Sequence, residues 1–205
     1  MPNTADALKS ALDFIAASDD RFAAALDAAG YPAPRIQPPG YRTMFKTIVG
    51  QQVSIAAANS VWNKLQAAYG EDCAPDAILA STAEALRACG LSAQKQSYAR
   101  SLAELVVSGA IDFASLPKDN EEAITLLTQI RGIGRWSAEI YLLFAEARPD
   151  IWPAGDLAIQ ESVGRIAGLT ERPAEKATRL IGDRWRPHRG AAAIFCWHYR
   201  HIAPL

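Results

Sequence analysis

One stretch decides the fold: Leu126-Leu127-Thr128-Gln129-Ile130-Arg131-Gly132-Ile133-Gly134-Arg135-Trp136-Ser137-Ala138. Before it, apolar residues recur at helical spacing behind a capping residue, Asp119, whose capping-box partner is Glu122 three residues on. The glycines interrupt this pattern, and a second helix is predicted from Trp136 to Ala147. Because glycine has no Cβ, Gly132-Ile133-Gly134 can turn sharply and approach a ligand closely. The sequence therefore predicts a helix, a tight glycine hairpin and a second helix.

This predicted hairpin suits a phosphate, because its N–H groups and the start of the second helix form a small positive concavity. Taken alone, Gly-Ile-Gly is more typical of a helix C-cap followed by a turn. A dinucleotide-binding motif is excluded, since its third glycine would fall at Ser137 and the preceding segment is helical. The choice between a phosphate-binding hairpin and a simple C-cap turn therefore depends on motifs elsewhere in the chain.

Composition favours an all-helical protein. The chain has 205 residues, 50% of them hydrophobic, and lacks strand-like alternation, so it can form one large domain or two small lobes. The net charge of −1 argues against coating nucleic acid by bulk charge. A nucleic-acid role must therefore depend on a local patch and on backbone N–H groups.

The cysteines and the N-terminus predict a cytoplasmic protein. Cys73, Cys89 and Cys196 have no metal-ligand spacing, which indicates buried or free thiols and no iron–sulfur centre. The first residues lack a basic region followed by an apolar run, and no apolar stretch is long enough to span a bilayer. We therefore expect no signal peptide and no membrane.

Apolar spacing and turn residues divide the chain into short helices, as in an irregular bundle. A proline-rich connector at 31–40 separates an N-terminal arm from the main body. A basic run with tryptophan at 184–189 is either a solvated face or, near a glycine hairpin, a phosphate-tracking surface. The predicted helices outside the central motif are 4–17, 19–29, 41–49, 55–69, 75–89, 91–108, 157–166 and 190–199.

Two positions carry candidate chemistry. Gln51 and Gln52 sit at a helix–helix junction, where they form either a solvated turn or an amide wedge that fills a gap in a base stack. Asp156 precedes a helix and is an N-cap candidate, which does not exclude catalysis. The helix after the hairpin carries the chain about 18 Å away. The loop at 148–155 reaches about 26 Å, so Asp156 can return beside Trp136.

Several motifs together resemble the helix-hairpin-helix–Gly/Pro–Asp superfamily of DNA glycosylases. The hairpin is followed by Pro153 and Asp156, as in that superfamily. The corner Ile48-Val49-Gly50-Gln51-Gln52-Val53-Ser54 and the ending Trp185-Arg186-Pro187-His188-Arg189 with Trp197 are similar to its 3-methyladenine DNA glycosylase II branch. The likeness covers about Tyr41 to the C-terminus, without that branch's additional N-terminal β-domain.

The resemblance implies a monofunctional hydrolase of base-excision repair. Its substrate would be the N-glycosidic bond of an alkylated base, of the 3-methyladenine type, flipped out of double-stranded DNA. Asp156 matches the family's catalytic aspartate, which stabilises the oxocarbenium-like transition state. Trp136 occupies the position of the lysine nucleophile of bifunctional members, and since tryptophan forms no Schiff base, no lyase activity is expected.

The resemblance also assigns a base pocket and a DNA-binding set. Trp136, Trp197 and Tyr141 would form the pocket, where an indole face attracts a cationic base. The resemblance implies no cofactor and no catalytic metal, a structural monovalent cation on the hairpin carbonyls, and a monomer. The DNA-binding residues would be Gly132, Gly134, Arg135, Ser137, Gln51 and Gln52.

The implied architecture is a single domain, 1–205, in two helical lobes with the active-site cleft between them. Lobe one would be about 42–135, and lobe two about 1–40 plus 148–205. Two alternatives remain: a non-catalytic helix-hairpin-helix DNA-binding module, and a glycosylase of the same fold for another base, adenine or a pyrimidine. A pure binding module does not need Asp156, so this residue separates the first alternative from the enzyme.

Overall fold

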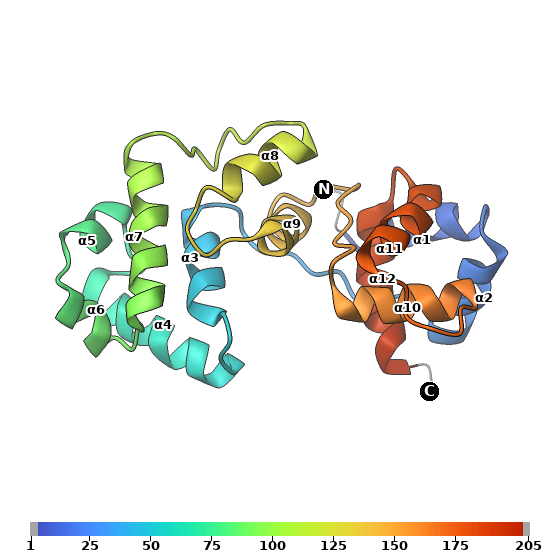
Figure 1. The fold of residues 1–205 in the computed structure, drawn as a ribbon, viewed down its shortest axis with the longest axis horizontal. Coiled ribbons are helices and arrows are strands. Elements are labelled where there is room, and N and C mark those ends of the chain that lie inside the picture. Colours follow the sequence, from blue (N-terminus) through green and yellow to red (C-terminus); the bar gives the residue numbers. More distant parts are fainter. Residues whose placement is uncertain (1–3, 203–205) are drawn as a thin grey trace. The chain divides into compact units, whose positions relative to one another are not determined.

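The computed structural model describes residues 4–202, and the side chains of residues 4–200. Every regular element in this part of the chain is helical, which confirms the predicted all-α class (Figure 1). The helices are α1 (Ala5–Ala16), α2 (Asp20–Ala29), α3 (Tyr41–Gly50), α4 (Ile55–Tyr69), α5 (Pro75–Ala80), α6 (Ala83–Ala88), α7 (Ala93–Val107), α8 (Asn120–Leu127), α9 (Arg135–Phe144), α10 (Leu157–Ala167), α11 (Glu175–Gly182), the 3₁₀ turn η1 (Asp183–Trp185) and α12 (Arg189–Ile202).

The chain divides into two compact units. One comprises residues up to Ile36 and from Leu142 onwards, and the other is Gln37–Tyr141, so a boundary falls inside α9. The predicted lobes, about 42–135 and about 1–40 plus 148–205, stay a prediction, as does the cleft between them. Residues 1–3 and 203–205 of the second predicted lobe lie outside the described residues.

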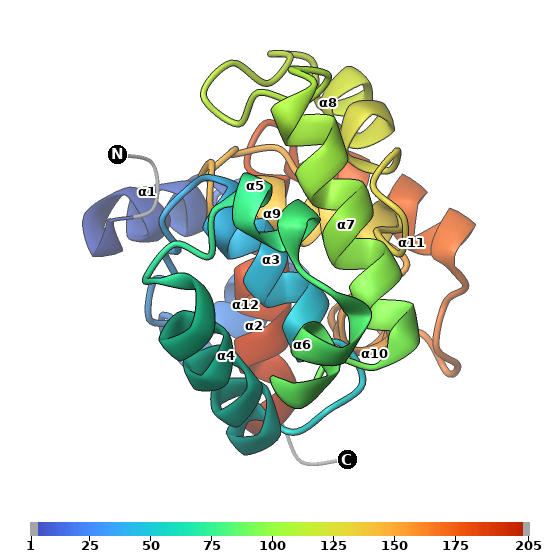
Figure 2. The ribbon, with the colours of Figure 1, turned by 90° about the vertical axis from the view of Figure 1, so that its left-hand side faces the viewer.

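In the unit Gln37–Tyr141, α7 is the central helix. It packs against α3, α5 and α6 (Figure 2). Apart from Gln96, its buried residues are small or apolar, namely Ala99, Leu102 and Ala103, which lets neighbouring helices approach closely. On the other side of α3, the Phe45 and Trp62 rings meet edge to face with centroids 5.6 Å apart. Because it is packed on several sides, α7 is a firm support for the loops beside it.

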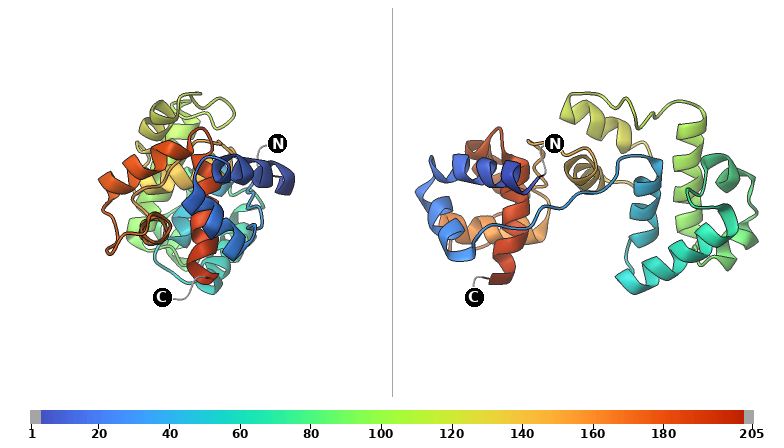
Figure 3. Two further views of the ribbon diagram at one scale, coloured as in Figure 1. Left: turned by 90° about the vertical axis from the view of Figure 1, so that its right-hand side faces the viewer. Right: turned by 180° about the vertical axis from the view of Figure 1, so that it is seen from behind.

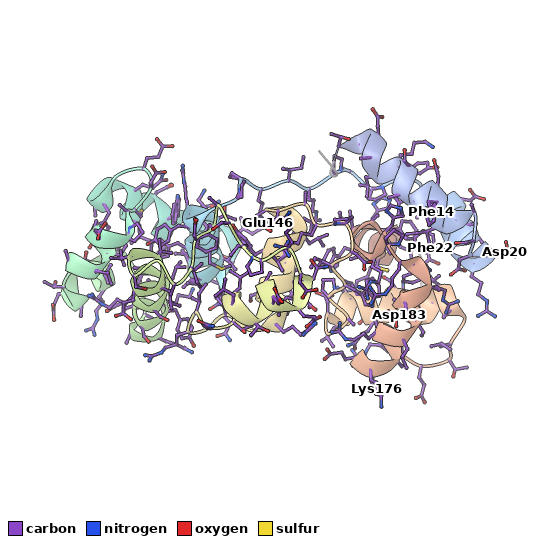
Figure 4. The ribbon with its side chains drawn as sticks, turned by 90° about the horizontal axis from the view of Figure 1, so that it is seen from above. Phe14, Asp20, Phe22, Glu146, Lys176 and Asp183 are labelled. Carbon is purple, nitrogen blue, oxygen red and sulfur yellow. The ribbon has the colours of Figure 1, made fainter. Side chains whose placement is uncertain are left out.

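In the other unit, α12 is central and contacts α1, α2 and α10 (Figure 3). Phe22 of α2 lies inside this unit, whereas Lys176 projects outward from α11 (Figure 4). The Phe22 ring packs against Trp185 and Phe195, with centroids 5.3 and 4.8 Å away. The buried Trp185 satisfies its polar atom by donating from Nε1 to Asp19 Oδ2 at 2.9 Å.

The region predicted as one helix at 75–89 is two helices, and that prediction is wrong. Ser81 and Thr82 separate α5 from α6. The Thr82 hydroxyl accepts a hydrogen bond from Ala85 N–H as an N-cap, and the Ser81 hydroxyl donates to the Ala77 carbonyl. Short hydroxyl side chains compete with the helical backbone in this way, so the break has a local cause.

Other element boundaries also differ from the predictions. The helix before the hairpin ends at Leu127, and the helix after it spans Arg135–Phe144 instead of extending to Ala147, whose φ is 55°. The helix α11 was not predicted. It packs through Thr178 and Gly182, so it has no stripe of large apolar residues to reveal it.

The cysteines are buried free thiols, as predicted. No helix in the described part of the chain is long and apolar enough to cross a membrane.

Candidate functional site

A groove of about 810 Å³ lies within the unit Gln37–Tyr141. It brings together the corner after α3 and the glycine hairpin before α9, two segments about 80 residues apart in the chain. Helix α7 also lines it, through Lys95 and Tyr98 among others. The predicted site residues that line it are Gln51, Gln52, Gly132, Trp136 and Ser137.

The hairpin has the geometry that its glycines predict. Gly132 has a φ of 82°, and a Cβ built on it would lie 2.3 Å from the Tyr98 ring, so no other residue fits without a shift. Within the described part of the chain, the N–H groups of Gly132 and Gly134 donate no hydrogen bond. Gly134 also stands at the start of α9, where its carbonyl accepts from Ala138 N–H. Such N–H groups at a helix start are suited to an anion.

The corner after α3 projects Gln52 into solvent. Gln52 has a φ of 55°, which is uncommon for a residue other than glycine and occurs where surrounding structure holds the backbone. The next residues present apolar surface, since Val53 is 44% exposed and Ile55 is 82% exposed. The Ser54 hydroxyl then caps α4 by accepting from Ala57 N–H. A polar tip flanked by exposed apolar side chains resembles a wedge more than a solvated turn.

The corner and the hairpin are joined by direct hydrogen bonds. Gln51, which was predicted to bind DNA, donates from Nε2 to the Gly132 carbonyl at 2.9 Å. Lys95 of α7 donates from Nζ to the Val49 carbonyl at 2.7 Å, and partial burial lowers the pKa of its ammonium. These contacts hold the two loops that line the groove.

Arg135 lies beside the hairpin, but its guanidinium is bound to carboxylates. It donates from Nη1 and Nη2 to Glu121, at 2.8 and 2.5 Å, and from Nε to the buried Glu139 at 3.0 Å. Hydrogen bonding to Glu121, together with the charge of Glu139, raises the pKa of Arg135. Its predicted contact with DNA stays a prediction.

Asp156 is the N-cap of α10, which confirms the predicted cap. Its Oδ1 accepts from Ala158 N–H at 2.9 Å and from Ile159 N–H at 3.1 Å. The same oxygen accepts from Trp197 Nε1 at 3.2 Å. The carboxylate is thus oriented by two elements of its unit, and the positive end of α10 favours its negative charge.

Trp197 therefore contacts the candidate catalytic residue directly. Its ring lies 5.6 Å from Phe144, centroid to centroid. The neighbouring Cys196 is fully buried, and burial, together with the charge of Asp156, raises the pKa of its thiol far above the ordinary range. The Cys196 thiol therefore stays protonated and takes no part as a nucleophile. Asp156 and Trp197 belong to the unit that does not hold the groove, so the expected proximity of Asp156 to Trp136 stays a prediction.

Trp136 and Tyr141 differ in accessibility, although both lie on α9. Trp136 is 48% exposed and lines the groove. Tyr141 is only 2% exposed, its ring packs against Phe113, and its hydroxyl accepts from Gly40 N–H at 2.7 Å. Tyr141 therefore has a structural role in anchoring the start of α3, and its base-pocket role stays a prediction.

The basic run at 184–189 does not form a free cationic stripe. Arg189 donates from Nε and Nη2 to the Asp150 carboxylate at 2.8 Å each. Arg186 pairs with Asp150 and Asp183, and Arg184 lies 3.7 Å from Asp19. Carboxylates of the same unit pair with these arginines, and the phosphate-tracking role of the run stays a prediction.

Lys95 and Tyr98 are groove residues that sequence reasoning missed. Their spacing of three places them on one face of a helix, which is a readable signal. The sequence does not show that this face meets the hairpin. Among the described residues, no three His, Cys, Asp or Glu side chains gather as metal ligands.

Comparisons with known proteins agree with this geometry. Residues 45–187 match the HhH-GPD superfamily of base excision DNA repair proteins. The chain is 34% identical over 167 residues to DNA-3-methyladenine glycosylase 1 of Schizosaccharomyces pombe, covering 80% of this chain and 73% of that protein. The chain belongs to the HhH-GPD superfamily, and the predicted family is confirmed.

Two solved structures share the fold. The S. pombe 3-methyladenine DNA glycosylase in complex with abasic DNA superposes with a TM-score of 0.78 at 30% identity, covering 92% of this chain and 95% of that one. A DNA-3-methyladenine glycosidase from Bacillus halodurans gives a TM-score of 0.82 at 30% identity, covering 91% and 87%. The helix-hairpin-helix glycosylase fold is therefore shown.

Proposed function

We propose that this protein is a DNA glycosylase of base-excision repair that hydrolyses the N-glycosidic bond of alkylated bases, of the 3-methyladenine type, flipped out of double-stranded DNA. The observation that carries the proposal is the carboxylate of Asp156, fixed at the start of α10 by two backbone N–H groups and the Trp197 indole. The names of the relatives described above support the substrate class. A non-catalytic DNA-binding module would need this carboxylate only as the cap of α10.

The chemistry asked of Asp156 is electrostatic. As the glycosidic bond breaks, positive charge develops on the sugar, and an ionised carboxylate held in place stabilises it without reorganising. A carboxylate can also activate the attacking water. An alkylated purine such as 3-methyladenine already carries a positive charge and leaves readily, so no strong general acid is required.

Trp136 suits the recognition of that base. Its indole is half exposed at the groove, and a tryptophan face attracts a cationic ring by about 1–2 kcal/mol. In the proposed complex, N–H groups of Gly132 and Gly134 bind a DNA phosphate, and Gln52 enters the space left by the extruded nucleotide. The exposed Val53 and Ile55 beside Gln52 support a wedge that contacts bases.

A lesion panel tests the substrate class. We expect the wild-type protein to release 3-methyladenine and other cationic alkylpurines from methylated DNA at least about tenfold faster than neutral deaminated or oxidised bases, a ratio set by the indole's preference for cations. Released bases are measured by chromatography. In the matched arm, Trp136→Leu should slow release of cationic bases more than release of neutral ones. Faster release of an oxidised or mispaired base would favour the alternative glycosylase reading.

We expect no lyase activity. Trp136 carries no amine, so an abasic site cannot form a Schiff base there. Incubation with abasic DNA and borohydride, followed by denaturing electrophoresis, should give no covalent adduct. An adduct would contradict the monofunctional assignment, and Lys95, the lysine that lines the groove, would be the first to replace.

The monomeric state, the cytoplasmic location and a monovalent cation at the hairpin stay predictions. The cation would share the hairpin carbonyls with Gln51, whose amide already donates to Gly132.

A further inference from the structure

We propose that Gln51 and Lys95 are positioning residues that hold the wedge corner (residues 49–53) and the phosphate hairpin (residues 131–134) as one preassembled unit, so that Gln52 enters DNA in register with the bound phosphate. This inference rests on the proposed function. It gives Gln51 a role through Gln52 and the hairpin, instead of a contact with DNA of its own.

The first observation is the direct link between the two segments. The Gln51 amide donates to the carbonyl of Gly132, a residue about 80 positions later in the chain. Adjacent residues at the corner thus face different ways, since Gln51 is half-buried and turned to the hairpin while Gln52 is exposed. A side chain that is already bonded to a backbone carbonyl is poorly placed to contact a base as well.

The second observation is that α7 supports both segments. Lys95 Nζ binds the Val49 carbonyl, at the end of α3 where the corner begins. One turn further along α7, the Tyr98 ring lies against Gly132. Arg131 of the hairpin is held by the hydroxyls of Ser97 and Ser101, which accept from its Nη1 and its backbone N–H at 2.9 and 3.0 Å. Successive turns of one rigid helix therefore fix the spacing between corner and hairpin.

The third observation is the backbone at Gln52. A φ of 55° is unfavourable for a non-glycine residue and persists only where neighbours hold it. The neighbours here are Gln51, tied to the hairpin, and Val49, tied to Lys95. Release of either tie lets Gln52 relax toward a more common conformation and lose its alignment before it meets DNA. Preorganisation of this kind is gained without any new contact to the ligand.

A double-mutant cycle tests the role of Gln51. The probe is a duplex with one tetrahydrofuran abasic analogue beside a 2-aminopurine, whose fluorescence rises when a wedge unstacks it. We expect Gln51→Ala to slow that rise about two- to tenfold, the effect of losing one neutral hydrogen bond. In a Gln52→Ala background, Gln51→Ala should have no further effect. Non-additivity identifies a residue that acts through its neighbour.

The control is Gln66→Ala, which removes a half-buried glutamine whose Nε2 also donates to a backbone carbonyl, that of Glu71 at 3.1 Å, outside the groove. It should leave the fluorescence change unaltered. Three results would each overturn the inference. The rate of the fluorescence rise could fall in the double variant by the product of the two single effects, it could be unchanged in Gln51→Ala, or the wild type could give no rise. Excision of methylated bases by the wild type is measured separately. If Gln51→Ala and Gln52→Ala are non-additive but the wild type does not excise methylated bases, the proposed substrate is wrong and the positioning role of Gln51 is still supported.

The role of Lys95 is tested by two measurements, the fluorescence rise and the salt dependence of DNA affinity. We expect Lys95→Met to slow the fluorescence rise about ten- to hundredfold, the effect of losing one charged hydrogen bond, and Lys95→Arg to restore it, because a guanidinium can also donate to the Val49 carbonyl. The slope of log affinity against log salt should not change in Lys95→Met. A slope smaller by about one would show that Lys95 contacts a phosphate, and its positioning role would be wrong.

Discussion

Asp156→Asn is expected to lower the single-turnover rate of 3-methyladenine release by about 10³-fold while duplex DNA is still bound. An amide cannot supply the negative charge that stabilises the developing positive charge on the sugar, and losing one such electrostatic group costs about 10²–10³ in rate. The amide oxygen of asparagine can still accept from Ala158 and Ile159 N–H and from Trp197 Nε1, as Oδ1 does now. Asparagine is also as good an N-cap as aspartate.

The stability of the variant separates chemistry from folding. We expect the Tm of Asp156→Asn to fall by no more than a few degrees, since the interaction of a charge with a helix end contributes about 0.3–1 kcal/mol. The matched control is Asp119→Asn. Asp119 caps α8 by the same pattern, accepting from Glu121 and Glu122 N–H, and the substitution should leave excision unchanged. If Asp156→Asn turns over normally, the catalytic assignment is wrong.

Most of the fold could be predicted from local signals. Apolar spacing located most helices, and Asp119 and Asp156 marked helix starts that the structure confirms. The errors have physical causes. Thr82 caps α6 within an alanine-rich region where helical propensity alone predicts continuity. In α11, contact is made through Thr178 and through Gly182, whose Cβ would lie 2.4 Å from Trp152 Nε1, so close approach replaces large apolar residues.

Less of the site could be predicted, because its geometry depends on contacts distant in the chain. The sequence singled out Gln51, Gln52 and Gly132, but nothing local shows that the Gln51 amide meets the Gly132 carbonyl. The resemblance placed Arg135 in the DNA-binding set. The Glu139 partner, four residues on, was readable from helical spacing, whereas Glu121 was not. Pairing of charges across a fold decides whether a basic residue is available for a phosphate.

Gly132→Ala is expected to destabilise the protein by about 2–5 kcal/mol. The new methyl group would lie 2.3 Å from the Tyr98 ring and 2.5 Å from its Cγ, so the whole ring has to move, and overpacking of this kind costs about 1–3 kcal/mol. A φ of 82° adds about 1–2 kcal/mol for a residue with a Cβ. For a chain of this length the Tm should fall by roughly 5–15 °C in thermal unfolding followed by circular dichroism.

Gly134, the other glycine of the hairpin, provides the matched control for Gly132→Ala. A Cβ on Gly134 meets no atom within 4 Å, so Gly134→Ala should change the Tm by no more than about 2 °C. It should nevertheless weaken duplex binding, because in the proposed complex the methyl group would stand where a DNA phosphate approaches the backbone N–H groups. Adding Tyr98→Ala to Gly132→Ala removes the ring and should relieve the steric part of the loss while the backbone strain remains. An unchanged Tm in Gly132→Ala would show that the hairpin moves freely relative to α7. The proposal that α7 holds the wedge corner and the phosphate hairpin as one preassembled unit would then be wrong.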